Sequence, residues 1–206
     1  MFLSRSRIQE LLDQLFEPGT SDPKCLNQSS YDLRLGPDTY LVGSDAPTRL
    51  SPDKPYLTIP PGQFAILTCH ESLDLPRQIM GFIALRNKFK MQGLVNISGF
   101  HVDPTFKGNL IFAVNNAAPS DIRLKLQEPT FMIFFAEVTG DIGEGRPEQK
   151  NPLRGIPLDL VQNLGGSSVT LMKIQKDIDE LRTRMLIYAP LAVAALLALI
   201  LSLLRH

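Results

Sequence analysis

Apolar residues follow different spacings along this chain of 206 residues, and each spacing predicts a different kind of element. Near the N-terminus, Ile8, Leu11, Leu12 and Leu15 recur three and four positions apart, which predicts one short amphipathic helix over Ser6–Phe16. After this helix, Pro, Gly, Asp and Asn interrupt the chain about every ten residues, a spacing typical of short strands joined by turns.

Several runs between these turns are predicted as strands. In Ile122, Leu124 and Leu126 the apolar residues alternate with polar ones, which is the period of a half-buried strand. Thr130–Val138 is more continuously apolar and is expected to be covered on both faces. The other predicted strands are Gln63–Cys69, Ile79–Leu85, Gly93–Gly99 and Asn109–Asn115. Many short strands without a βαβ rhythm predict a mainly β head: a sandwich, a jelly roll or a distorted barrel.

A C-terminal segment differs from the head in composition. Met185–Leu204 carries no charged residue, and all of it except Pro190 and Ser202 is hydrophobic. As a helix it would extend roughly 30 Å, the thickness of the hydrocarbon core of a bilayer. Such a helix is apolar on every side, and a head of this size could not enclose it, so we expect one transmembrane helix.

The flanks of this segment predict its orientation. Positive residues precede it at Lys173, Lys176, Arg182 and Arg184, and only Arg205 follows it. Because positive charge concentrates on the cytoplasmic side, we expect a tail-anchored membrane protein with a cytoplasmic N-terminal domain.

Heptad spacing precedes the predicted span at Leu171, Ile174, Ile178, Leu181 and Met185. It predicts a stalk helix, for which a coiled coil and a simple juxtamembrane amphipathic helix are the two alternatives. An oligomeric head would favour the coiled coil by raising the local concentration of the stalks.

The predicted organisation has three parts. They are a β domain over residues 1–160, a linker with the stalk helix over 161–184, and the transmembrane helix over 185–204. Within the first part, the Gly- and Pro-rich stretch Thr139–Pro157 predicts a mobile arm, and Gly165–Ser168 predicts a flexible link to the stalk.

Charge and composition narrow the classes of function. Lys and Arg number 21 and Asp and Glu number 21, so the chain lacks the basic excess of a nucleic-acid-binding protein. Cys25 and Cys69 have no CxxC context, and the three histidines lack the spacing of metal ligands. No metal site is predicted, and both cysteines are interpreted as reduced packing residues.

A series of motifs lies along residues 5–138. They are Gln28-Ser29-Ser30-Tyr31-Asp32-Leu33-Arg34-Leu35-Gly36, Pro61–Ala65, Glu71–Leu73, Arg86–Phe89, His101–Gly108 and Asn116. In order and spacing this series resembles the dCTP deaminase family, in the superfamily shared with trimeric dUTPases. The resemblance implies a dUTPase-like jelly-roll or β-barrel head, and a homotrimer whose deoxynucleotide sites lie between subunits.

The resemblance also implies which chemistry is missing. Deamination in this family needs a glutamate that moves protons between water, the pyrimidine ring and the leaving ammonia. The matching position is Ala113, whose methyl group cannot carry a proton. The basic motif of the family, Arg-Ser-Ser-Leu-Ala-Arg, appears as Arg86–Met91, without the serines and the second arginine. The resemblance therefore implies a chain that has lost deamination.

Part of a pyrophosphatase site is retained. Asp103 matches the aspartate that orients the attacking water in dUTPases, and is the expected catalytic residue if the chain is an enzyme. Phe106 matches the aromatic residue that stacks on deoxyribose. Asn87 replaces the serine of that site, and the closing arm is poorly matched by Gly143–Pro147.

Four residues are candidates for nucleotide binding: Arg86, Lys88, Phe106 and Asn116. The two cations suit phosphate oxygens, although solvated charges at a strand edge are the alternative. Phe106 has core packing as its alternative, and Asp103 with Pro104 has a simple turn. Asp32 and Arg34 are expected to pair with each other and stabilise the fold.

Three hypotheses follow for the function. The leading one is a membrane-anchored trimer that binds a dCTP- or dUTP-like nucleotide without deaminating it, as a nucleotide sensor or membrane effector. The second is an active dCTP deaminase or dUTP pyrophosphatase with an altered site. The third is a structural scaffold whose cleft between subunits is filled by Phe89, Met91 and Phe134. No cofactor is predicted apart from Mg²⁺ as a companion of a bound triphosphate.

Overall fold

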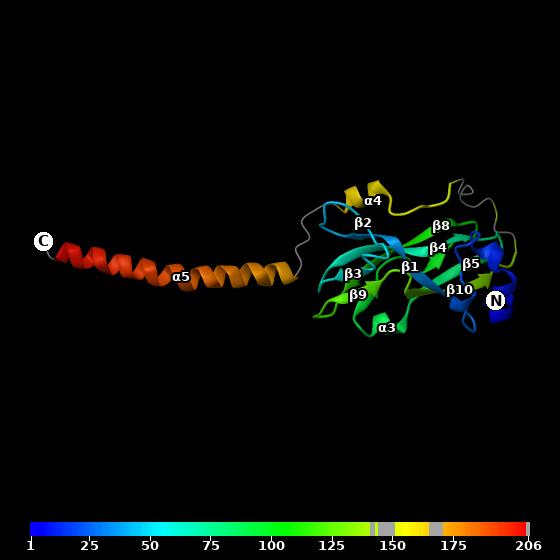
Figure 1. Cartoon of the computed structure of the whole chain (residues 1–206), viewed down its shortest axis with the longest axis horizontal. Helices are drawn as coiled ribbons and strands as arrows, with labels where there is room; N and C mark the ends of the chain where they lie inside the picture. Colours follow the sequence, from blue (N-terminus) through cyan, green and yellow to red (C-terminus); the bar gives the residue numbers. More distant parts are fainter. Residues whose placement is uncertain (141–142, 144–150, 165–170, 205–206) are drawn as a thin grey trace. The chain divides into compact units, whose positions relative to one another are not determined.

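A computed structural model of the chain describes residues 1–140, 143, 151–164 and 171–204, although several side chains of the last range lie outside the description. The chain divides into two compact units, residues 1–168 and residues 169–206. The first holds the β domain and the second is a single helix, α5 (Leu171–Leu204) (Figure 1).

The N-terminal helix is present but broken. α1 (Arg5–Glu10) and α2 (Leu12–Leu15) replace the single predicted helix, because Leu11 between them has a non-helical backbone. Ser4 begins α1, and its hydroxyl accepts a hydrogen bond from the backbone N–H of Arg7. The apolar face predicted from the spacing is buried against the sheet.

The first unit is mainly β, as predicted. Among the described residues, strands are joined into one antiparallel sheet in the order β6-β8-β4-β1-β10-β5-β7, with β2 paired to β1, and β3 pairs separately with β9. The strands are β1 (Tyr31–Leu41), β2 (Thr48–Arg49), β3 (Tyr56–Ile59), β4 (Phe64–Asp74), β5 (Ile79–Leu85), β6 (Leu94–Asn96), β7 (His101–Val102), β8 (Lys107–Asn116), β9 (Ile122–Lys125) and β10 (Pro129–Glu137). Two short helices interrupt them, the 3₁₀ helix η1 (Pro23–Cys25) and α3 (Asn87–Lys90).

The core lies along the alternating inner positions of these strands. On β8 every second residue from Gly108 to Asn116 is buried. Phe112 of this strand stacks on Phe131 of β10 with ring centroids 3.6 Å apart. Period-2 alternation therefore produces the core as the sequence predicted.

The prediction for β10 was wrong in one respect. Its buried and half-buried residues alternate, so the strand is not covered equally on both faces. The outer face carries Phe134, whose ring lies 6.3 Å from that of Phe2. The N-terminal segment also bonds to this strand, since Leu3 donates its N–H to the carbonyl of Phe135. The continuous apolar pattern thus reflects a core face and a partly covered aromatic face.

The described end of the predicted mobile arm is docked. Leu153 donates its N–H to the carbonyl of Lys107 and accepts from the N–H of Asn109, at 3.0 and 2.9 Å. This places residues 151–156 alongside the start of β8, and α4 (Leu158–Asn163) follows them. For these residues the prediction of a mobile arm was wrong, because the backbone finds partners that a Gly- and Pro-rich composition does not reveal.

The second unit contains the predicted stalk and span. Ile174, Ile178, Leu181 and Met185, four of the heptad positions, are exposed in this single chain. Among the residues that the structure describes, no helix combines the length and the apolarity that a membrane crossing requires. The side chains of Ala192 and other positions of the predicted span lie outside those described, as do the predicted link Gly165–Ser168 and Arg205. The span and the coiled coil stay predictions.

Candidate functional site

The loop between β7 and β8 carries the first two candidate residues. The side chain of Asp103 is 60% exposed, and its Oδ1 lies 3.4 Å from Nε2 of His101. Phe106 is half-buried and packs against the core. Between them Thr105 has a φ of +65°, and its N–H bonds to the carbonyl of Leu75. The loop thus presents a carboxylate to solvent beside an anchored aromatic ring.

Arg86 and Lys88 lie where β5 passes into α3, and each contacts a carboxylate. Nη1 of Arg86 donates to Oδ2 of Asp32 at 2.7 Å, and Nζ of Lys88 donates to Oε1 of Glu128. The predicted pairing of Asp32 with Arg34 is therefore wrong. The register of β1 shifts between Leu33 and Arg34, and Arg34 bonds to Glu71 instead. Both candidate cations are already partly neutralised within the chain.

A single chain does not bring these two groups together. β7 pairs with the beginning of β5, where Val102 lies opposite Gly81. Arg86 follows the other end of β5, about 16 Å further along the strand at roughly 3.3 Å per residue. Asp103 and Phe106 therefore lie at one end of β5, and the cations lie at the other. A nucleotide site that used all four would have to span this separation or draw on a second copy of the chain.

Asn116, the remaining candidate, has a structural role. It is fully buried on β8, and its Nδ2 donates to the carbonyls of Ile59 and Ser120, each at 2.8 Å. Its Oδ1 accepts from the N–H of Ala118. The amide therefore ties three backbone segments together, and we do not retain Asn116 as a nucleotide-binding residue.

Ala113 has no carboxylate among its backbone partners in the described part of the chain. It is half-buried on the outer face of β8, opposite Ile66 of β4. On its other side, its carbonyl accepts from the N–H of Ile97, and its N–H donates to Oγ of Ser98. None of these neighbours has an acidic side chain, so the backbone partners of position 113 offer no carboxylate.

A buried ion pair lies between β1 and β4. Nε of Arg34 donates to Oε1 of Glu71 at 2.6 Å, and the N–H of Arg34 donates to Oε2 at 2.8 Å. Burial raises the pKa of Glu71, although these contacts with Arg34 oppose the shift. Burial also raises the pKa of Tyr31, whose hydroxyl accepts from the N–H of Asp22. In the sequence, this pair is indicated by a charged residue within each of two mainly apolar strands, Arg34 in β1 and Glu71 in β4.

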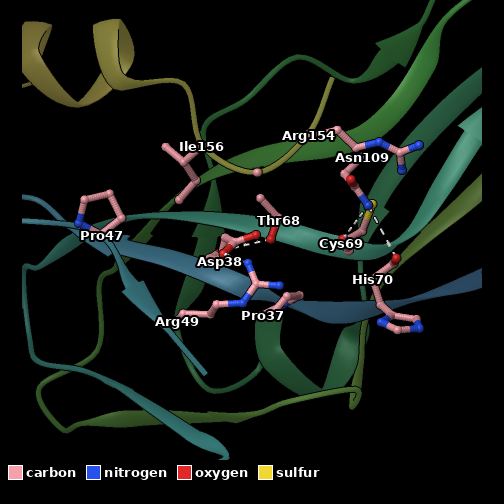
Figure 2. A pocket seen from close by; sticks show the side chains of 11 residues that line it. Pro37, Asp38, Pro47, Arg49, Thr68, Cys69, His70, Asn109, Arg154 and Ile156 are labelled. Atoms are coloured by element: carbon pink, nitrogen blue, oxygen red, sulfur yellow. Dashed lines mark hydrogen bonds and ion pairs between the residues drawn. The ribbon is translucent and has the colours of Figure 1, made fainter. Parts of the chain in front are cut away.

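A surface pocket of about 480 Å³ was not predicted from the sequence (Figure 2). β1, β4 and β8 form one side of it, and the docked segment after β10 forms the other. Its lining is Pro37, Asp38, Pro47, Arg49, Thr68, Cys69, His70, Asn109, Arg154, Gly155 and Ile156. None of these was a candidate, because they come together only when distant segments pack.

Metal coordination is not indicated in the described part of the chain, where no group of three or more His, Cys, Asp or Glu side chains could hold an ion. Both cysteines are free and buried. Burial raises the pKa of Cys69, so this thiol is a packing group and not a ready nucleophile.

Comparison with known proteins gives consistent matches to one family. The model of a family described as dCTP deaminase-like matches residues 2–138. The dCTP deaminase of Thermococcus kodakarensis is 33% identical over 141 residues, which are 68% of this chain and 83% of the relative. That of Thermococcus sibiricus is 31% identical over 142 residues, 69% of this chain and 83% of the relative.

The solved structures show the same fold. The 2'-deoxycytidine 5'-triphosphate deaminase of Agrobacterium tumefaciens superposes with a TM-score of 0.55 at 18% identity. The match covers 65% of this chain and 48% of that protein, so the aligned part is about half of its length. At this identity the likeness concerns the fold alone.

Proposed function

Because the chain belongs to the dCTP deaminase-like family, we propose that it binds a dCTP- or dUTP-like deoxynucleotide and does not deaminate it. The observation that carries the proposal is Ala113. Its register partner Ile66 and its neighbours Ile97 and Ser98 provide no carboxylate to replace the one that this position lacks. Without a positioned acid and base, proton transfer to the ring and to the leaving ammonia is not assisted.

Retained residues support the binding part of the proposal. Asp103 and Phe106 are presented on one loop, while Arg86 and Lys88 offer guanidinium and ammonium groups for phosphate oxygens. Their separation along β5 suits a site that is completed by a second copy, as in the homotrimer that we propose. In such a site Mg²⁺ would accompany the phosphates.

The test uses the full chain in detergent micelles with dCTP and dUTP in the presence of Mg²⁺. We expect nucleotide-dependent stabilisation in a thermal-shift measurement, without release of ammonia. A variant with Asp103→Asn should be stabilised less, whereas Arg7→Gln, a surface change on α1, should behave as the original chain. Ammonia release from dCTP would overturn the loss of deamination, and the absence of stabilisation by any deoxynucleotide would overturn binding.

A second candidate function rests on the contact between Asp103 and His101. An exposed carboxylate whose Oδ1 lies 3.4 Å from an imidazole nitrogen can orient a water molecule for attack on a phosphate. This arrangement favours a dUTP pyrophosphatase over a deaminase. Release of pyrophosphate and dUMP from dUTP, abolished by Asp103→Asn, would establish it in place of silent binding.

We also propose that the C-terminal segment anchors the protein in a membrane, with the head in the cytoplasm. The support is the uncharged sequence Met185–Leu204 and the excess of Lys and Arg before it. Exposure of Ile178 and Leu181 on α5 suits a stalk that assembles with its copies and transmits nucleotide binding to the membrane. Retention in the membrane pellet after alkaline extraction is expected, and would be lost on truncation after Arg184.

A further inference from the structure

The pocket of Figure 2 lies where the pairing register shifts in two pairs of neighbouring strands. The register of β1 against β4 shifts between Leu35 and Thr39, and that of β4 against β8 shifts between Thr68 and Ser72. Such shifts leave backbone groups without ladder partners. In the second, Nδ2 of Asn109 satisfies the carbonyls, with donor–acceptor distances of 3.0 Å to Glu71 and 3.2 Å to Cys69. On the inner wall of the pocket, these two carbonyl groups therefore have a hydrogen-bond partner within the protein.

The outer wall is the docked segment after β10. Arg154 holds it in place, because Nη2 contacts both carboxylate oxygens of Glu17 at 2.9 and 2.7 Å, and Nη1 donates to Ser72. The next residue, Gly155, has a φ of +61°, and a Cβ there would lie 3.3 Å from Oδ2 of Asp38. This left-handed turn lets the backbone approach Asp38 closely and directs Ile156 into the lining.

One cation of the lining can turn toward a ligand. Arg49 and Arg154 contribute two guanidinium groups, and Asp38 contributes one carboxylate. Nη1 of Arg49 lies 2.7 Å from Oδ1 of Asp38, but the arginine side chain is 74% exposed. Exposed ion pairs contribute little stability, so Arg49 can turn toward a ligand at small cost. The side chain of Arg154 is 57% exposed, but its guanidinium contacts the carboxylate of Glu17, so Arg49 is the cation that a ligand can recruit.

The other lining residues indicate which further chemical groups the ligand carries. A carboxylate such as Asp38 accepts hydrogen bonds from hydroxyl groups, and Pro37, Pro47 and Ile156 supply apolar surface. A volume of about 480 Å³ is within the range of small-molecule sites. We propose that this pocket binds a phosphate monoester of a sugar or nucleoside, with the phosphate on Arg49 and the hydroxyl groups on Asp38.

A ligand in this position has a structural consequence. It contacts β1 and β4 on one side and Arg154 to Ile156 on the other, so it adds contacts that hold the segment against the domain. This segment leads into α4. Occupancy of the pocket therefore controls how often residues 151–156 detach, independently of the nucleotide-binding residues proposed above.

Equilibrium dialysis of the full chain in detergent micelles against radiolabelled ribose 5-phosphate tests the proposal. We expect saturable binding that becomes roughly tenfold weaker with Arg49→Gln, since one charge-assisted hydrogen bond is lost. Arg154→Gln should release the segment that forms the outer wall, and it should weaken binding because that wall is lost. Arg7→Gln is the matched control, because Arg7 forms an exposed ion pair with Glu10 on α1. Asp103→Asn should leave binding unchanged.

Further ligands distinguish the sources of the phosphate. If adenosine 5'-monophosphate binds more tightly than ribose 5-phosphate, the base contacts the apolar residues of the lining and the ligand is a nucleotide. If the two bind equally, the ligand is a sugar phosphate. Both results support the proposal. Inorganic phosphate that binds as tightly as the esters would overturn it, as would binding insensitive to Arg49→Gln. As a second measurement, ribose 5-phosphate should slow amide hydrogen exchange in residues 151–156, and an unchanged rate at saturation would also contradict the proposal.

Discussion

Asp32 and Arg86 form an ion pair in which Oδ2 accepts from Nη1 at 2.7 Å, while Oδ1 of Asp32 is buried without a hydrogen-bond partner in the described part of the chain. The pair links β1 to the start of α3. Arg86 is therefore the cation that compensates the charge of this buried carboxylate, although it bonds to only one of the two oxygens. The position of Asp32 is therefore sensitive to any change at Arg86.

Replacing Arg86 by Gln should destabilise the protein by about 1–3 kcal/mol, because a buried carboxylate loses its counter-charge. Chemical denaturation of the full chain in detergent would measure this. Adding Asp32→Asn should recover part of the loss. Lys88→Gln, which removes a more exposed pair with Glu128, should cost less than about 1 kcal/mol. Equal effects of the two single changes would show that burial of Asp32 is unimportant.

The Arg34–Glu71 pair should be more sensitive. Glu71 is fully buried, so Glu71→Gln removes the nearer charge partner of Arg34, leaves only Asp22 at 3.9 Å, and should cost about 3–5 kcal/mol. Glu10→Gln, on the exposed face of α1, is the control and should cost less than about 0.5 kcal/mol. The midpoint of denaturant unfolding distinguishes them. A Glu71 variant as stable as the control would exclude a structural role for the pair.

Gly108 should be required for docking of the segment after β10. Its φ is +117°, and a Cβ there would overlap the backbone N and O of Leu153. Gly108→Ala should therefore detach residues 151–156 and raise their amide hydrogen exchange. Gly19→Ala is the control, because Gly19 also has a positive φ, but a methyl group there would have none of the described atoms within 4 Å. Equal exchange in the two variants would contradict the proposed close approach.

His70 should make stability depend on pH. Burial, followed by the charge of Arg34, lowers its pKa below the usual value of 6.5. The unfolded chain therefore binds a proton more readily, so the contribution of His70 is present above pH 6.5 and is lost as pH falls toward the folded pKa. His70→Gln should reduce this acid destabilisation in thermal unfolding measured between about pH 7 and 5. Arg7→Gln, on the exposed face of α1, is the control and should retain the acid destabilisation of the original chain.

Local elements followed from the sequence where burial alternates simply. The predicted strand Ile79–Leu85 has the same bounds as β5, and the alternation from Ile122 is confirmed as β9. The predicted strand Gly93–Gly99 shortens to β6, because after Asn96 the backbone leaves the ladder and both Ile97 and Ser98 donate to one carbonyl of Ala113. Hydrogen bonding to a distant residue ended this strand, and no local pattern encodes that.

The candidate site was predicted less completely than the strands. Resemblance suggested Asp103, Phe106 and Arg86, whose roles stay predictions, and it matched the alanine at 113 to the glutamate of the family. It also suggested Asn116, whose amide instead serves the backbone of Ile59 and Ser120. The polarity of a residue predicts that it needs partners, but not which partners it finds.

The amino-acid sequence alone determined the mainly β domain, the bounds of the strand Ile79–Leu85 and the absence of a carboxylate at position 113. Each depends on the identity of one residue or on polarity repeated over a few neighbours. The tertiary structure alone decided that Asp32 pairs with Arg86, that Arg34 pairs with Glu71, and that Leu153 docks beside Gly108. These contacts join positions 37 to 54 residues apart, so they depend on strand order and register.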